Sequence, residues 1–80
     1  MSEINEAVKL VILKRKKEMY ENTYYDLSIE FEIATELEDE PSKEEARKKM
    51  VKIKKAINLL EKKIEPIAKG VKDVVVENNS

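Results

Sequence analysis

The sequence lacks several residue types on which common protein chemistries depend. It contains no cysteine, no histidine and no tryptophan, and it has a single glycine. Without cysteine there is neither a disulfide framework nor a thiolate nucleophile, and without histidine the commonest general base and metal ligand is missing. Charged residues make up 41% of the chain, yet the formal net charge is only −1, so the charge balance does not identify a partner. We therefore expect no catalytic residue and no cofactor.

The near-zero net charge hides charges that are strongly segregated along the chain. Residues 1–17 carry a net charge of +3, residues 18–40 carry nine acidic residues and no Lys or Arg, and residues 43–63 carry a net charge of +6. An acidic block beside a basic block of similar length favours two elements folded against each other. With 80 residues in total, the chain can form one small domain with a thin core.

The second half of the chain has the clearest periodicity. Apolar residues recur there at alternating steps of four and three, which is the heptad pattern of a helix that packs along a neighbour. This row consists of Ala46, Met50, Ile53, Ile57, Leu60, Ile64, Ile67 and Val71. Pro41 and a capping box formed by Ser42 and Glu45 predict that the helix covers about residues 43–69. Pro66 predicts a kink, Gly70 a C-terminal cap, and residues 71–80 a C-terminal tail.

The first half of the chain carries a second heptad row, which predicts a helix over about residues 3–38 with Ser2 as its cap. This row consists of Leu10, Leu13, Lys17, Tyr20, Tyr24, Leu27, Phe31 and Ala34. A strand is the alternative for residues 27–33, where apolar and polar residues alternate, with residues 74–76 as its only candidate partner. Neither Gly nor Pro interrupts residues 22–34, which favours the helix.

Two helices joined by a short turn at residues 39–42 give the predicted fold: an all-α, antiparallel two-helix coiled-coil hairpin spanning residues 1–70. In this register the acidic block faces the basic block, and opposite charges beside the interface select the pairing. The acidic residues are Asp26, Glu30, Glu32 and Glu36, and the basic ones are Arg47, Lys49, Lys52 and Lys54.

The first helix carries more apolar residues than one heptad row uses. Six of them fall outside the row: Val8, Ile12, Met19, Tyr25, Ile29 and Ile33. A helix that is apolar on two sides is usually buried on two sides, and a lone hairpin makes a poor core. We therefore expect a homodimer in which this face packs against its symmetry mate to form a four-helix bundle. The alternatives are burial beneath residues 71–76 or a face that docks another protein.

A basic face on the second helix suggests a different function. Lys48, Lys52, Lys55 and Lys62 point roughly the same way, which suits an anion such as a nucleic-acid backbone. However, all the aromatic residues lie in the first half of the chain, so no stacking platform is interleaved with these lysines. We expect contact with protein rather than with nucleic acid.

The spacing of four acidic residues suggests a metal site. Glu18 and Glu21, followed by Glu36 and Asp39, resemble the magnesium-binding carboxylates of the all-α nucleotide pyrophosphohydrolases. On one continuous helix Glu18 and Asp39 are about 30 Å apart, which is too far for a shared ion. We therefore expect solvated carboxylates and no metal site.

Several stretches of the chain together resemble short uncharacterised helical-hairpin proteins encoded by bacterial prophages. They are the stretch from Tyr20 to Leu27, the pair Ile33-Ala34, the acidic turn, and the stretch from Lys54 to Glu61. The resemblance covers roughly residues 10–64 and implies a small regulator or inhibitor of a host protein. The sequence shows neither a secretory signal nor a run of about 18 apolar residues, so we expect a cytoplasmic protein that does not contact the membrane.

Overall fold

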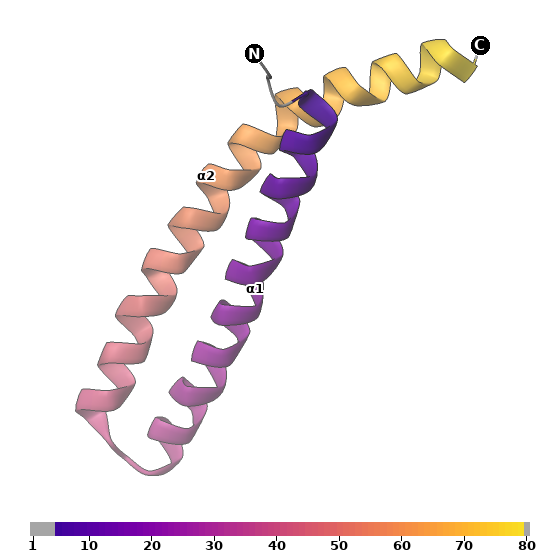
Figure 1. Cartoon of the computed structure of the whole chain (residues 1–80). Coiled ribbons are helices and arrows are strands. Elements are labelled where there is room, and N and C mark those ends of the chain that lie inside the picture. The colour runs from indigo at the N-terminus through magenta and orange to yellow at the C-terminus, as the bar shows by residue number, and fades with distance from the viewer. Residues whose placement is uncertain (1–4, 80) are drawn as a thin grey trace.

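The structure is a helical hairpin. It is a computed structural model that describes the backbone of residues 5–79 and the side chains of residues 5–70. Helix α1 (Glu6–Glu36) and helix α2 (Glu40–Asn79) run antiparallel and side by side, joined by a short turn (Figure 1). The prediction of two helices packed against each other is confirmed. The alternative of a strand over residues 27–33 is wrong, because α1 is continuous through that stretch.

Both heptad rows face the interface between the two helices. The buried side chains are Leu27 and Ala34 of α1 and Ala46, Ile57 and Leu60 of α2, and all five belong to the rows. The other row members up to Ile67 are half-buried, while Val71 lies outside the described side chains. Positions three and four residues apart share one side of a helix, so the heptad spacing by itself places the core.

The reversal between the helices is shorter and earlier than the expected turn at residues 39–42. Helix α1 ends in a Schellman motif, in which the Asp39 amide donates to the Ala34 carbonyl (2.8 Å) and the Glu38 amide to the Thr35 carbonyl (3.1 Å). Glu38 has a positive φ of 55°, a conformation that glycine usually supplies at this point. Residues 37–39 therefore complete the turn.

Helix α2 begins at Glu40, before Pro41 rather than after it. Asp39 is the cap in place of Ser42, because its carboxylate accepts a hydrogen bond of 3.2 Å from the Ser42 amide. Proline is tolerated in the first turn of a helix, where its missing N–H would have no helical partner. Hydrogen bonding by the Ser42 side chain, and then by its backbone amide, lowers the pKa of Asp39.

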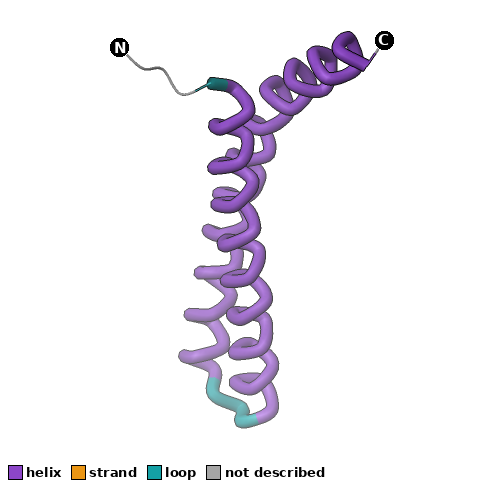
Figure 2. The backbone as a smooth tube through the Cα atoms, turned by 45° about the vertical axis from the view of Figure 1, so that its right-hand side comes forward, coloured by secondary structure: helices purple, strands orange, loops and turns teal. Residues whose placement is uncertain are grey.

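The outer ends of the helices also differ from expectation. Helix α1 begins at Glu6, where the Asn5 side chain accepts a hydrogen bond of 2.9 Å from the Val8 amide; the cap expected at Ser2 lies outside the described residues. Helix α2 continues through Pro66 and Gly70 to Asn79, so Gly70 is not a cap and the expected tail is helical as far as residue 79. This last part bends away from the hairpin (Figures 1 and 2), beyond the proline that predicts a kink.

The hairpin is a single layer of helices. Its Cα atoms span 58 × 31 × 14 Å. The chain exposes 6621 Å² of surface, about a third more than the roughly 5000 Å² typical of a compact monomer of this mass. Within the part of the chain that the structure describes, the outward sides of both helices are therefore left without a covering layer.

Candidate interaction surfaces

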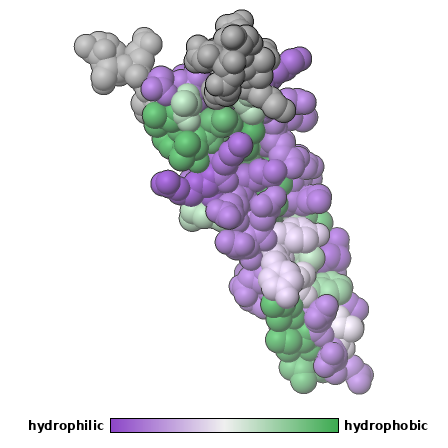
Figure 3. All heavy atoms as spheres, turned by 90° about the vertical axis from the view of Figure 1, so that its right-hand side faces the viewer, coloured by the Kyte–Doolittle hydropathy of each residue, from purple (hydrophilic) through white to green (hydrophobic). Residues whose placement is uncertain are grey.

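The side of α1 that faces away from α2 carries exposed apolar side chains. All six residues predicted for this face are exposed, from 38% for Ile29 to 69% for Tyr25. The alternative of burial beneath residues 71–76 is therefore wrong, and the end of α2 bends away instead (Figure 1). Figure 3, which views this side, shows apolar surface gathered toward both ends of the hairpin, with hydrophilic surface between. We call this surface, from Val8 to Ile33, the outer face.

The outer face lies opposite the helix interface because of a simple offset in the sequence. Ile29 follows Leu27 by two positions, and Ile33 follows Phe31 by two positions. Two residues along an α-helix correspond to a rotation of about 200°. A residue placed two positions after a buried one therefore points away from α2, where none of the described residues covers it.

Two further residues extend this apolar surface beyond the six that were predicted. Val11 is 54% exposed and Leu37 is 72% exposed. Val11 lies two heptads before Tyr25, so the shared heptad position is a signal in the sequence that identifies it. Leu37 lies three residues after Ala34, one position before the next step of the buried row. It is exposed because α1 ends there and the chain reverses direction.

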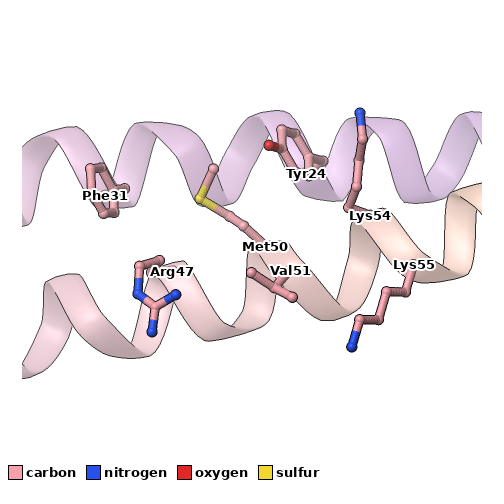
Figure 4. Close-up of a pocket in the computed structure, with 7 residues that line it drawn as sticks. All are labelled: Tyr24, Phe31, Arg47, Met50, Val51, Lys54 and Lys55. Carbon is pink, nitrogen blue, oxygen red and sulfur yellow. The ribbon is translucent and has the colours of Figure 1, made fainter.

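A shallow groove of about 460 Å³ lies between the helices on one side of the hairpin (Figure 4). It is lined by Tyr24, Phe31, Arg47, Met50, Val51, Lys54 and Lys55. Met50 points toward α1 between the two aromatic rings, whereas Lys55 points away from α1 (Figure 4). The Lys54 ammonium lies 5.8 Å from the centre of the Tyr24 ring, within the range of a cation–π contact. The heptad steps place Tyr24, Phe31 and Met50 at the interface but do not reveal the groove.

The predicted contacts between the acidic block and the basic block do not form. Among residues 5–70, the only ion pair that joins the helices is that between Lys17 and Glu61, at 3.3 Å. The other pairs lie within one helix: Lys9 with Glu6, Lys17 with Glu21, Arg47 with Glu44, and Lys49 with Glu45. Exposed side chains reach a neighbour three or four residues away more easily than one on another helix. Among residues 5–70, the acidic block therefore makes no ion pair with α2.

Three of these ion pairs, two of them made by Lys17, have identifiable local effects. Lys17, the polar member of the α1 row, extends its ammonium to Glu61 and Glu21 while its side chain stays only 29% exposed. Its aliphatic part can thus pack at the interface with the charge at the rim. The hydrogen bond from Arg47 lowers the pKa of Glu44, and the same contact raises the pKa of Arg47.

The lysines predicted as an anion-binding face are all exposed on α2. They are Lys48, Lys52, Lys55 and Lys62, and none of them makes an ion pair with another residue of 5–70. Lys55 also borders the groove. These four ammonium groups therefore remain accessible to an anion in solution.

The four carboxylates that resemble a metal site are not brought together. Glu18 and Glu21 lie near the middle of α1, while Glu36 and Asp39 lie at the turn, where Asp39 caps α2. No group of three potential metal ligands comes together among the described residues. Nor does either helix, over the part that the structure describes, have the length and apolar character needed to cross a membrane.

No protein-family model, no curated protein and no solved structure matches this chain. The function is therefore inferred from the surfaces of the hairpin itself.

Proposed function

We propose that this chain is a non-enzymatic protein–protein interaction module that self-associates through the outer face of α1. The exposed apolar side chains opposite the helix interface are the observation that supports this function, since large exposed apolar patches mark interaction sites. Burial of a side chain such as Ile29 or Ile33 contributes about 1.5–3 kcal/mol. A hairpin with five buried side chains among residues 5–70 gains a large share of its stability from such contacts.

The assembly is a homodimer of four helices, two from each chain, related by a two-fold axis. Covering the outer face gives α1 a neighbour on both sides, as expected for a helix that is apolar on both sides. The resemblance to prophage-encoded hairpin proteins supports a role as a small cytoplasmic regulator or inhibitor of a host protein. The dimer would contact that protein without help from a cofactor.

Sedimentation equilibrium tests the self-association. The wild-type chain should sediment as a dimer at about 100 μM, whereas the double variant Ile29→Lys, Ile33→Glu should sediment as a monomer, because it places charges in the apolar contact. The variant Val51→Lys, Leu59→Glu is a matched control, since it makes the same changes at two exposed apolar residues of α2. A monomeric wild type refutes the proposal. If only the control variant dissociates into monomers, the dimer interface lies on α2 instead.

Nucleic-acid binding through α2 is a second candidate function. It is supported by the four exposed lysines that make no ion pair among residues 5–70. If it is correct, the wild type should be retained on heparin at low salt and released as salt rises. The variant Lys48→Gln, Lys62→Gln should elute earlier than a control, Lys14→Gln, Lys16→Gln, that removes the same charge from α1. If the two variants elute at the same salt concentration, retention depends on the total positive charge of the chain and not on the lysines of α2.

A further inference from the structure

The outer face of α1 contains a complete heptad row of its own. Its residues recur at alternating steps of four and three: Val8, Ile12, Arg15, Met19, Asn22, Asp26, Ile29 and Ile33. We call these eight residues the outer row, and all of them are exposed. The spacing is that of a coiled-coil interface, repeated on the side of α1 opposite to α2. The outer row is therefore suited to a second helix lying along α1.

The outer row matches itself when it is read in the reverse direction. From the two ends inward, Val8 corresponds to Ile33 and Ile12 to Ile29. The next pair is Arg15 with Asp26, which carry opposite charges, and Met19 and Asn22 meet at the centre. Two copies of α1 placed antiparallel would thus bring apolar residues together toward both ends of the row and a cation against an anion further in, with Met19 against Asn22 at the centre. A parallel arrangement in register would bring Arg15 against Arg15 and Asp26 against Asp26.

The charges of the whole helix favour the same orientation. Residues 5–17 carry a net charge of +4 and residues 18–36 a net charge of −6. An antiparallel pair lays the positive half of one α1 over the negative half of the other, whereas a parallel pair lays like charges together. Lys9, Lys16 and Glu30 share one heptad position beside the outer row, and opposite charges at such positions set helix orientation. Within residues 5–70, Asp26 and Glu30 make no ion pair that would compete.

We infer that two copies of this chain pair through their outer rows in antiparallel orientation, with the two-fold axis level with Tyr20 and Glu21. The inference rests on the proposed self-association and adds its orientation and register. Because the two rows of α1 lie about 200° apart, the two α1 helices lie at the centre and each α2 on the outside. The two hairpin turns then lie at opposite ends of the dimer.

A charge exchange tests the orientation. Arg15→Asp or Asp26→Arg alone sets like charges against each other twice in an antiparallel dimer, and each should weaken dimerisation by about tenfold or more. The double variant Arg15→Asp, Asp26→Arg restores both pairs and should dimerise within about threefold of wild type. Both residues are exposed, so circular dichroism should show unchanged helix content in all three variants. A double variant no tighter than the weaker single one overturns the antiparallel register.

Cysteine cross-linking tests the register independently, because the natural chain has no cysteine. A mixture of the single variants Ile12→Cys and Ile29→Cys should form a disulfide-linked dimer on mild oxidation. Either variant alone should not, since the two copies of the substituted position are then about 25 Å apart along the helix axis. Cross-linking of each variant with itself would instead indicate a parallel pair and overturn the inference.

The two kinds of failure can be told apart. A wild-type chain that sediments as a monomer refutes self-association and, with it, the register. A wild-type chain that sediments as a dimer, but shows neither rescue by charge exchange nor the mixed disulfide, leaves self-association standing and refutes the antiparallel outer-row pairing.

Discussion

At Glu38 the backbone adopts a left-handed conformation that costs a residue with a side chain about 1 kcal/mol relative to glycine. The Schellman hydrogen bonds around it require this conformation. Glu38→Gly should therefore raise the free energy of unfolding by about 0.5–1 kcal/mol, measured by urea denaturation, after allowing for the greater entropy of glycine in the unfolded chain. The control Glu32→Gly, at an exposed position inside α1, should lower it by about 1 kcal/mol. Equal destabilisation by both changes would contradict the assigned turn.

Ile57 and Lys55 lie two positions apart on α2 but in opposite environments. Ile57 is 8% exposed in the helix interface, whereas Lys55 is exposed and points away from α1 (Figure 4). Ile57→Asp should unfold the hairpin, because a buried charge without a partner costs several kcal/mol, about 3 or more. Lys55→Asp should change the free energy of unfolding by no more than about 0.5 kcal/mol. Circular dichroism melts distinguish these outcomes, and similar losses would mean that the row on α2 is misplaced.

At the scale of the element, the start of α2 depends on an ionised carboxylate. The pKa of Asp39 is lowered in the folded chain, so the unfolded chain binds more protons in acid, and the folded state loses stability there. The contribution of the cap is complete above the usual Asp pKa of about 3.9 and disappears as the pH falls through the lower, folded-state value. The melting temperature should fall between about pH 5 and pH 2.

The variant Asp39→Asn separates this cap from the other carboxylates. Asparagine caps a helix about as well as aspartate but does not ionise. The variant should therefore melt close to wild type near neutral pH, where Asp39 is ionised, and show a shallower decline in melting temperature as the solution is acidified. An identical pH profile for the two proteins would show that the acid sensitivity arises elsewhere, for example at Glu44, whose pKa is also lowered.

The rows of the two helices could be predicted from the sequence because spacing alone decides which residues share a side of a helix. The bounds of the turn could not, because Asp39 and Ser42 are both good caps and Pro41 is compatible with a first helical turn. Asp39 becomes the cap because α1 already ends at Glu36 and Glu38 reverses the chain. The spacing of apolar residues does not determine whether Asp39 or Ser42 caps α2.

The surfaces were predictable to different degrees. The exposure of the outer face follows from its two-residue offset from the buried row, so the sequence is sufficient for residues such as Ile29 and Ile33. The cross-helix ion pairs predicted from the charge blocks do not form. The one pair that joins the helices among residues 5–70, between Lys17 and Glu61, was not among those predicted. An ion pair between long exposed side chains contributes only about 0–1 kcal/mol. The net charges of the two blocks therefore do not predict which pairs form.

On the scale of the whole molecule, stability and assembly are expected to be coupled. The hairpin is one layer of helices with five buried side chains among those that the structure describes, and the outer row leaves five further apolar side chains exposed on its surface. A partner that binds only the folded chain stabilises it by mass action. If that partner is a second copy, the folded state should depend on the protein concentration itself.

The melting temperature should therefore rise with protein concentration. Each tenfold increase stabilises a folded dimer by about 1.4 kcal/mol relative to two unfolded chains, which corresponds to a shift of about 4 °C for a dimer of this size. Calorimetry between about 10 μM and 1 mM should show this trend for the wild type and for the α2 control Val51→Lys, Leu59→Glu. The variant Ile29→Lys, Ile33→Glu should melt at a lower temperature that does not vary with concentration, because its hairpin unfolds as a monomer. A wild-type melting temperature that stays constant over the whole range would mean that the hairpin folds alone, and that the outer face receives a different protein.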